Sequence, residues 1–329
     1  MKFLITGGAG FIGSHLVDLL KTKKNVSEIK VIDNLEDGSL KNLKNSLKNK
    51  KVSFFKKDIR NFNSIQSIFK GIDKVIHLAA LSDVVPSIVE PRLYMENNIN
   101  GTINVLESMR KYKVKKIVYA ASSSCYGISK YFPTSEKNIT HPKYPYAISK
   151  LIGEDLIRHW SMVYKINFVS LRLFNVYGTR SRSNSAYGAA LGVFLKQKME
   201  KKPFTIVGDG KQKRDFIYVS DVCDAFYKAA VKNLRKEILN IGFGKPRSVN
   251  DMVGILGGSK TFVPKRPGEP DLTHANISKA TKLLDWKPKI KLEDGLKIVL
   301  KNINYWKDAP LWTPKKIRLA TKDWFKYLK

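Results

Sequence analysis

The chain has few cysteines and lacks any long run of apolar residues. Cys125 and Cys223 are the only cysteines among 329 residues, and they lie far apart, with no CxxC or metal-ligand spacing. This usage favours two free thiols in a reducing compartment over a disulfide framework. No stretch offers the ~18 consecutive apolar residues of a membrane-spanning helix, and the apolar run before the first glycines is too short for a secretory signal. We therefore expect a cytoplasmic protein with no membrane partner.

Glycine, proline and histidine are also scarce. With 21 glycines, 13 prolines, 43% hydrophobic and 27% charged residues, the composition excludes a fibrous or disordered chain and provides for a core. The five histidines form no HxxxH or similar pair, so we expect no metal site. At ~150 residues per domain, the length corresponds to about two domains or one large α/β unit.

Acidic residues are outnumbered by basic ones. There are 28 aspartates and glutamates against 60 lysines and arginines, for a formal net charge of +32. Such an excess is compatible with nucleic acid, anionic lipid or an anionic substrate. Lysines occur in nearly every segment, however, and the densest runs accompany no recognised nucleic-acid motif. We therefore expect no nucleic-acid partner, while a small diphosphate-bearing substrate also fits the charge.

Short apolar runs alternate with amphipathic segments through the first half of the chain. Strands are expected at 2–6, 29–33, 52–55, 74–80, 116–122 and 166–174, and helices at 11–21, 40–47, 62–70, 92–111 and 144–164. After residue 174 the rhythm breaks into shorter pieces, but 219–233 and 237–242 again resemble a helix and a strand of the sheet. The pattern predicts an α/β fold with a doubly wound parallel sheet and helices on both faces.

Three glycines, Gly7, Gly10 and Gly13, lie between the first expected strand and the first expected helix. Glycines here let backbone N–H groups approach a pyrophosphate, whose charge is favoured by the helix N-terminus. Asp33 ends the second strand, where a carboxylate accepts the adenosine ribose hydroxyls and repels a 2′-phosphate. The pattern predicts a Rossmann dinucleotide site that takes NAD rather than NADP. A turn or helix cap is the alternative for Asp33 and Asn34.

A tyrosine and a lysine share one face of the expected helix 144–164. Tyr146 and Lys150 are spaced i, i+4. An ammonium beside a phenol stabilises the phenolate, so we expect the pKa of Tyr146 to fall below its reference of ~10. Such a pair is common on helices. Ser122 raises its significance, because it ends the fifth strand at the edge where parallel sheets bind ligands, and its hydroxyl can relay a sugar proton to Tyr146.

The ordered motifs GGAGFIGSHL, HLAAL, NNINGT, YAASSSCYG, PYAISK, LFNVYG, RDF and KRPGE resemble the extended short-chain dehydrogenase/reductase family. The resemblance covers nearly the whole chain and is closest to the nucleotide-sugar epimerases and dehydratases. It implies a bound NAD that takes a hydride from a sugar carbon and returns it. Further expected cofactor contacts are Phe11, Ile12, Asn34, Asp58, Ile59, Leu78, Ala79, Ala80, Asn97, Tyr146 and Lys150. An N-cap role is the alternative for Asp58.

The same resemblance implies the organisation of the molecule. We expect residues 1–173 and 214–242 to form the NAD-binding Rossmann domain. Residues 174–213 and 243–329 would then form a second, smaller α/β domain that binds the nucleotide sugar. A homodimer is also implied, in which the helices near 92–111 and 144–164 pair into a four-helix bundle.

The residues after Ser122 favour one reaction over others. Related dehydratases carry an Asp-Glu pair there and decarboxylases a Glu, whereas this chain has Ser123 and Ser124, which supply no acid or base for elimination. The resemblance therefore favours C4 epimerisation of UDP-glucose and UDP-galactose or of their N-acetylamino forms. UDP-glucuronate epimerisation and another nucleotide-sugar epimerase or dehydratase remain alternatives. A noncatalytic NAD-binding partner protein is a further one, although it would not need Ser122, Tyr146 and Lys150 together.

Substrate contacts follow from the resemblance as well. Asn175, Arg214 and Arg266 match residues that hold the diphosphate, a role suited to guanidinium groups. Asn175 stands where epimerases of uronic acids more often have Thr, which disfavours UDP-glucuronate. Glu269 replaces a usual Asp and is expected to accept ribose hydroxyls. The small Thr273 leaves room for an N-acetyl group without requiring one.

Two segments carry less information. The segment 183–190 matches the part of the family that covers uracil through its backbone. The aromatic tail lies outside every motif quoted above, and we expect it to pack against the second domain or a neighbouring subunit. Its large side chains are Trp306, Trp312, Trp324, Phe325 and Tyr327.

Overall fold

A seven-stranded parallel sheet dominates the protein in this computed structural model, which describes residues 1–181 and 190–328. Its strand order is β11-β6-β5-β4-β1-β2-β3. The bounds are β1 Lys2–Thr6, β2 Glu28–Asp33, β3 Val52–Lys56, β4 Lys74–His77, β5 Lys116–Ser122, β6 Asn167–Leu173 and β11 Glu237–Ile241. The order reverses between β1 and β4, and ligands of such sheets bind beyond the carboxyl ends of the strands at this point. The predicted doubly wound sheet is confirmed.

The central strand β1 shows why the sheet is covered on both sides. Ile5 pairs in register with Val31 of β2 and with Ile76 of β4. Side chains alternate between the two faces of a strand, so Phe3 and Ile5 enter one buried cluster while Leu4 enters the other. Apolar residues on both faces require helices on both faces.

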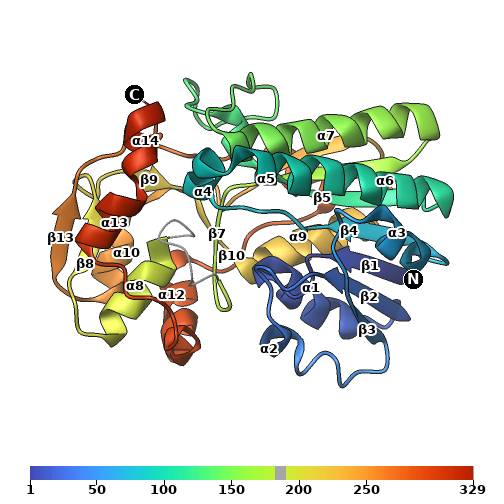
Figure 1. The fold of residues 1–329 in the computed structure, drawn as a ribbon, viewed down its shortest axis with the longest axis horizontal. Helices are drawn as coiled ribbons and strands as arrows, with labels where there is room; N and C mark the ends of the chain where they lie inside the picture. Colours follow the sequence, from blue (N-terminus) through green and yellow to red (C-terminus); the bar gives the residue numbers. More distant parts are fainter. Residues whose placement is uncertain (182–189, 329) are drawn as a thin grey trace.

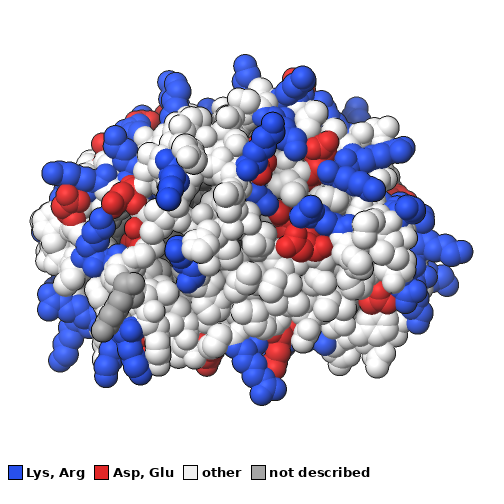
Figure 2. Space-filling model, turned by 90° about the horizontal axis from the view of Figure 1, so that it is seen from above, with Lys and Arg blue, Asp and Glu red and all other residues white. Residues whose placement is uncertain are grey.

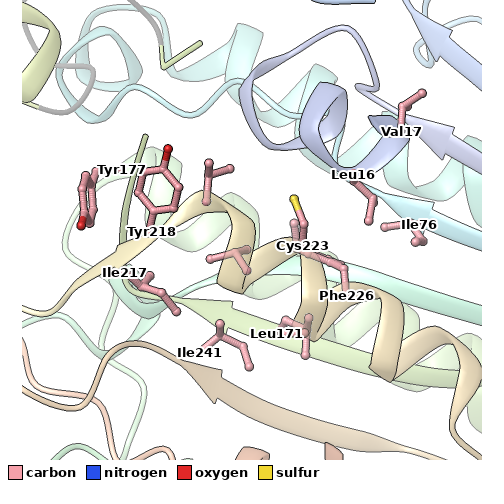
Figure 3. Packing of buried hydrophobic residues seen from close by; sticks show 14 of the residues in the cluster. Leu16, Val17, Ile76, Leu171, Tyr177, Ile217, Tyr218, Cys223, Phe226 and Ile241 are labelled. Carbon is pink, nitrogen blue, oxygen red and sulfur yellow. The ribbon is translucent and has the colours of Figure 1, made fainter. Parts of the chain in front are cut away.

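Helices supply these two covers (Figure 1). On one face lie α1 Phe11–Lys21 and α9 Val219–Val231, and on the other lie α5 Pro91–Met95, α6 Gly101–Lys111 and α7 Pro145–Tyr164. Figure 3 shows how α9 fills its side: Cys223 and Phe226 lie among Leu16 of α1 and Leu171 of β6. The predicted segments 219–233 and 237–242 thus return to the main sheet as α9 and β11.

Three predicted helices are shorter or less regular than expected. The segment 40–47 contains only α2 Leu40–Leu43, after which the backbone continues in turns such as the bond from the Ser46 N–H to the Leu43 carbonyl (2.8 Å). The segment 62–70 is α3 Phe62–Ile65 followed by a 3₁₀ turn. The segment 92–111 is α5, a π-helical turn over Glu96–Asn100, and α6.

Most of the remaining elements form a smaller layer beside the carboxyl edge of the sheet (Figure 1). Two do not: α4 (Val84–Val89) packs against α5 and α7, and α11 (Ser278–Leu284) packs against α9 and β11. The bounds of all these elements are α4 Val84–Val89, β7 Asn175–Tyr177, α8 Ala190–Met199, β8 Phe204–Val207, β9 Lys213–Arg214, β10 Phe216–Tyr218, β12 Arg247–Ser248, α10 Val249–Leu256, β13 Lys260–Val263, α11 Ser278–Leu284, α12 Leu292–Lys301, α13 Pro314–Ala320 and α14 Lys322–Tyr327. The pairs β10–β7, β12–β9 and β13–β8 are small separate sheets.

Charge is distributed broadly over the surface. Figure 2 shows lysines and arginines mostly toward the margins of the visible face, with fewer acidic side chains among them and a largely uncharged area across its middle. Across residues 1–181 and 190–328, none of the helices has both the length and the apolar character needed to cross a membrane.

Candidate active site

A cavity of about 440 Å³ opens at the carboxyl edge of the sheet, where the strand order reverses. Most of the predicted site residues line it. They are Gly7, Gly10, Phe11, Ile12, Gly13, Asp33, Asn34, Ile59, Leu78, Ala79, Ala80, Asn97, Ser122, Ser123, Ser124, Tyr146, Lys150 and Asn175. Most of these residues come from the carboxyl ends of different strands, from the turns that follow the strands, and from α7. They meet in one cavity although they are distant in the sequence.

The glycine turn after β1 is too tight for other residues. Gly7 has a φ of +72°, and a Cβ built there would lie 2.7 Å from the backbone nitrogen of Ala79. A Cβ on Gly13 would lie 2.2 Å from the carbonyl oxygen of Gly7. Helix α1 begins directly after Gly10, which supplies no side-chain cap. The first N–H groups of α1 thus face the cavity edge without a capping side chain, as a pyrophosphate site requires.

Asp33 ties the second strand to this turn. Its carboxylate accepts hydrogen bonds from the backbone N–H of Ala9 (2.9 Å) and of Leu35 (2.8 Å). Burial raises its pKa in spite of these two donors. The bond to Leu35 is a turn contact, so the alternative role is also present, while the side chain still lines the cavity. This turn and this carboxylate fit the pyrophosphate and ribose of a dinucleotide.

Asp58 lies beside the cavity and reaches it through Asn34. The Asn34 amide donates to the Asp58 carboxylate at 3.1 Å, and Arg60 donates to the same group. Although burial opposes it, hydrogen bonds from Arg60 and Asn34 hold the pKa of Asp58 below its ordinary value. The N-cap of α3 is Asn61, so the N-cap role considered for Asp58 is wrong.

The three residues of the proposed catalytic group lie together. Ser122 ends β5 and hydrogen-bonds with Tyr146, which stands in the first turn of α7. The Lys150 ammonium lies 4.2 Å from the ring centroid of Tyr119, beneath the cavity. All three line the cavity.

The expected low pKa of Tyr146 is wrong for the protein without ligands. Burial raises the pKa of Tyr146 to about 12, against the hydrogen bond from Ser122. Burial also lowers the pKa of Lys150 to about 7, although the charge of Glu154 opposes this. The sequence spacing predicted an attraction between the two groups, but desolvation by burial is the largest cause of both pKa shifts.

A buried ion pair under Lys150 escaped the sequence-based prediction. Glu154 is 1% exposed and accepts from Arg172 of β6 at 2.6 Å. Arg172 also donates to the hydroxyl of Tyr126, which donates in turn to Asn240. The signal was available, since Glu154 follows Lys150 at i+4 on the same face of α7. This network anchors α7 to the sheet directly below the catalytic group.

The predicted substrate residues form a second group beside the cavity. The carboxylate of Glu269 lies 2.7 Å from the Arg266 guanidinium and 3.9 Å from that of Arg214. Burial lowers the pKa of Arg214, whereas the charge of Glu269 raises it. Glu269 was expected to accept ribose hydroxyls; here it is engaged by both arginines. Arg214, Arg266 and Glu269 do not line the 440 Å³ cavity, and Arg266 lines a separate space beside α13.

Thr273 connects this group to the cavity wall. Its hydroxyl donates to the side-chain oxygen of Asn175 (2.9 Å), a cavity residue, and accepts from the backbone N–H of Asp215 (3.0 Å). The threonine is therefore held in place by two hydrogen bonds rather than free to rotate. The segment 183–190, expected over uracil, falls almost entirely outside the described residues.

The sequence matches the model of the NAD dependent epimerase/dehydratase family over residues 3–242. This chain belongs to that family. The matched stretch of the epimerase/dehydratase chain includes the glycine turn, the Ser122, Tyr146 and Lys150 group, and the return of α9 and β11 to the sheet.

Known members of the family resemble this chain over nearly its full length. The putative UDP-glucose 4-epimerase of Methanocaldococcus jannaschii is 39% identical over 305 residues, which cover 90% of this chain and 96% of that protein. A crystal structure of the UDP-glucuronic acid 4-epimerase of Bacillus cereus with UDP-glucuronic acid and NAD has a TM-score of 0.86 at 35% identity, covering 94% and 99% of the two chains. The UDP-glucose 4-epimerase of Thermotoga maritima with UDP-glucose has a TM-score of 0.85 at 33% identity, with the same coverage.

Proposed function

We propose that this protein is an NAD-dependent epimerase that inverts C4 of a UDP-hexose, either glucose and galactose or their N-acetylamino forms. One observation carries the proposal: Ser122, Tyr146 and Lys150 line the same cavity as the glycine turn, while the next two positions are serines without acid–base capacity. Epimerisation needs only proton transfer at the 4-hydroxyl, whereas elimination needs a further acid and base. The names of the similar proteins support the same reaction class.

The cofactor would be held by the glycine turn, Asp33 and the residues at the ends of β3, β4 and β5. The N–H groups at the start of α1 would face its pyrophosphate, and Asp33 its adenosine ribose. When bound, NAD supplies an acceptor, and in the return step a donor, of the hydride at the sugar C4. We further propose that residues 1–173 with 214–242 bind NAD and that 174–213 with 243–329 bind the nucleotide sugar, as the return of α9 and β11 to the main sheet supports.

Tyr146 would take the proton of the sugar 4-hydroxyl, with Ser122 orienting that hydroxyl. A phenol whose pKa is raised to about 12 by burial needs nearby positive charge to act as a base at neutral pH. Lys150 can provide it, since its pKa of about 7 leaves it partly protonated there. Glu154 favours the protonated form of Lys150. The buried pair below the cavity therefore supports the base through the lysine.

The diphosphate of the substrate would lie against Arg214 and Arg266. Guanidinium groups bind phosphate oxygens in a planar, bidentate manner. Glu269 keeps the Arg266 guanidinium at 2.7 Å and so orients it before substrate arrives. Asn175 would hold the diphosphate from the cavity wall, and Thr273 would lie near the sugar, where its small side chain leaves room for an N-acetyl group.

UDP-glucuronate 4-epimerisation is the second candidate. It is favoured by the similarity to the Bacillus cereus enzyme, which is as close in structure as the glucose enzyme of Thermotoga maritima. The position of Asn175, where uronic-acid epimerases more often carry threonine, argues against it.

The deciding experiment follows the sugar anomeric protons by NMR. The purified protein is incubated separately with UDP-glucose, UDP-N-acetylglucosamine and UDP-glucuronate. We expect interconversion of a glucose-series or N-acetylglucosamine pair and no accumulation of a 4-keto-6-deoxy sugar. Conversion of UDP-glucuronate alone would establish the second candidate instead.

A single substitution tests the base. Tyr146→Phe removes the phenol oxygen and should reduce turnover by about 10³-fold or more, in the range of a lost general base. NAD content, measured after denaturation, should be unchanged, because the ring remains. Turnover near that of the unmodified protein would contradict the assignment of Tyr146.

A further inference from the structure

The C-terminal helix α14 (Lys322–Tyr327) lies against the substrate side of the cavity. It packs against α4, which begins at the cavity residue Val84, directly after the cavity residues Ser82 and Asp83. Figure 1 shows α14 at the end of the chain, above the smaller layer of the molecule. Trp324 of this helix is only 2% exposed. The tail is thus built into the protein on the side where the substrate would bind.

The indole of Trp324 makes a hydrogen bond to the backbone of residues 265–270, the arginine segment, which contains Arg266. Its N–H donates to the carbonyl oxygen of Pro267 at 2.7 Å. Pro267 stands between Arg266 and Glu269, at a turn where Gly268 has a φ of +72°. A backbone bond at this place fixes the position of the segment 265–270 more directly than a bond to one of its flexible side chains.

The same indole also contacts the start of the catalytic helix. Its ring lies 5.9 Å from the ring of Tyr144, measured between centroids. Tyr144 is the N-cap residue of α7, two positions before Tyr146. It hydrogen-bonds with Ser124 and lies within the fields of Glu269 and Arg214. One side chain of the tail therefore connects the arginine segment to the catalytic helix.

The arginine segment (residues 265–270) also borders a space beside α13. A cavity of about 250 Å³ lies between it and α13. The cavity is lined by Val263, Pro264, Arg266, Ile317, Arg318, Thr321 and Phe325. Because side chains do not fill this space, the contacts of the segment on its other side contribute more to its position.

We propose that Trp324 is a positioning residue that holds the segment 265–270 against the start of α7 and thereby sets the affinity for the nucleotide diphosphate. The inference rests on the proposed function for the identity of the ligand. Trp324 acts through the segment that carries Arg266, and it is not among the residues that line the 440 Å³ cavity. It should therefore affect nucleotide binding while leaving the chemical step and NAD retention intact.

The test compares two tryptophan variants of the full-length protein with its NAD retained. Trp324→Phe removes the N–H donor but keeps an aromatic ring against Tyr144. Trp306→Phe is the matched control, because Trp306 is also buried in the C-terminal region and its N–H has no hydrogen-bond partner among the described residues. The dissociation constant of UDP is measured by calorimetry, along with KM and kcat for the sugar nucleotide that the protein converts.

We expect the dissociation constant of UDP and KM to rise about 3- to 10-fold in Trp324→Phe, the effect of losing one ordinary hydrogen bond. The value of kcat should stay within about twofold, since no reacting group is touched. Trp306→Phe should match the unmodified protein in the dissociation constant of UDP, in KM and in kcat. Unchanged UDP binding in Trp324→Phe, or an equal rise in both variants, would overturn the inference. Failure of the unmodified protein to convert any UDP-hexose would overturn the proposed function instead, while the UDP measurement would still decide the role of Trp324.

Discussion

Burial controls protonation at several residues around the sheet. His77 is fully buried at the end of β4, with its ring nitrogens 2.6 Å from the Thr6 hydroxyl and 3.0 Å from the Thr102 hydroxyl. Burial, with a smaller effect from the charge of Lys150, lowers its pKa from 6.5 to about 3. His77 is therefore neutral in the folded protein at pH values where an unfolded chain would protonate it.

This difference makes stability depend on pH. Between pH 6.5 and about 3, the unfolded state binds a proton at His77 that the folded state does not, so the free energy of unfolding falls as the pH decreases. At pH 5 the loss from this one residue should be on the order of 1–2 kcal/mol. His77→Gln keeps a polar side chain without the titration and should lose less stability between pH 7 and pH 5, measured by urea unfolding.

The control for this prediction is His159→Gln, since His159 is exposed on α7. That variant should lose as much stability on acidification as the unmodified protein does. The prediction is wrong if the His77 variant shows the same pH dependence as the control.

At the residue scale, the sequence predicted which side chains line the cavity better than it predicted their pKa values and ion-pair partners. Motif order placed Ser122, Tyr146 and Lys150 correctly at one site. It did not predict that burial raises the pKa of Tyr146, because desolvation depends on how neighbouring elements close over a group. The engagement of Glu269 by both arginines likewise depends on contacts between segments that the spacing does not define.

Among the elements, the first turn and helix show how strongly one glycine is constrained. A Cβ at Gly13 would meet two backbone atoms, at 2.2 Å from the oxygen of Gly7 and 2.7 Å from the Cα of Gly8. Neither atom belongs to a flexible side chain, so β1 and α1 would have to separate. Gly13→Ala should destabilise the protein by about 1–3 kcal/mol, as overpacking does, and the purified variant should contain little NAD.

A second helix offers the opposite case. Gly254 lies within α10, and a Cβ there would meet no described atom within 4 Å. Gly254→Ala should stabilise the protein by about 0.5–1 kcal/mol, because alanine favours a helix and lowers the entropy of the unfolded chain. Thermal unfolding of the two variants provides the measurement. If Gly13→Ala and Gly254→Ala changed the stability equally, the space around each glycine would not determine the effect of the substitution.

Element types were predicted more reliably than element lengths. Strands and long helices follow from apolar periodicity, and β5 and α1 have the predicted bounds. The π-helical turn over Glu96–Asn100 was not predicted. Within it, Asn98 is fixed by bonds to the backbone of Leu81 and to the Ser149 hydroxyl. These partners come from distant segments, so the local sequence contains no sign of the irregular turn.

At the scale of the whole molecule, α6 and α7 offer a surface on which two copies of the chain can pair. We propose a homodimer formed through α6 and α7, which lie side by side on one face of the sheet. Several apolar side chains near the end of α7 are exposed, among them Met162 at 58%. Sedimentation equilibrium should give the mass of two chains.

A charged residue on this face tests the arrangement. Met162→Glu should weaken self-association by about tenfold or more, because the interface would bury an unpaired charge. Ile298→Glu on α12 is the control, since Ile298 is similarly apolar and 37% exposed but lies on another face. A dimer unaffected by Met162→Glu would show that this part of α7 does not form the interface.

The path of the chain has a consequence for synthesis on the ribosome. Strand β6 is complete at Leu173, but its outer neighbour β11 begins only at Glu237, after β7, α8, β8, β9, β10 and α9 have been made. Until then, the nascent polypeptide carries a bare strand edge, which is a template for pairing with other chains. Chaperone demand during translation should therefore be greatest over this interval and should end when Ile241 leaves the exit tunnel.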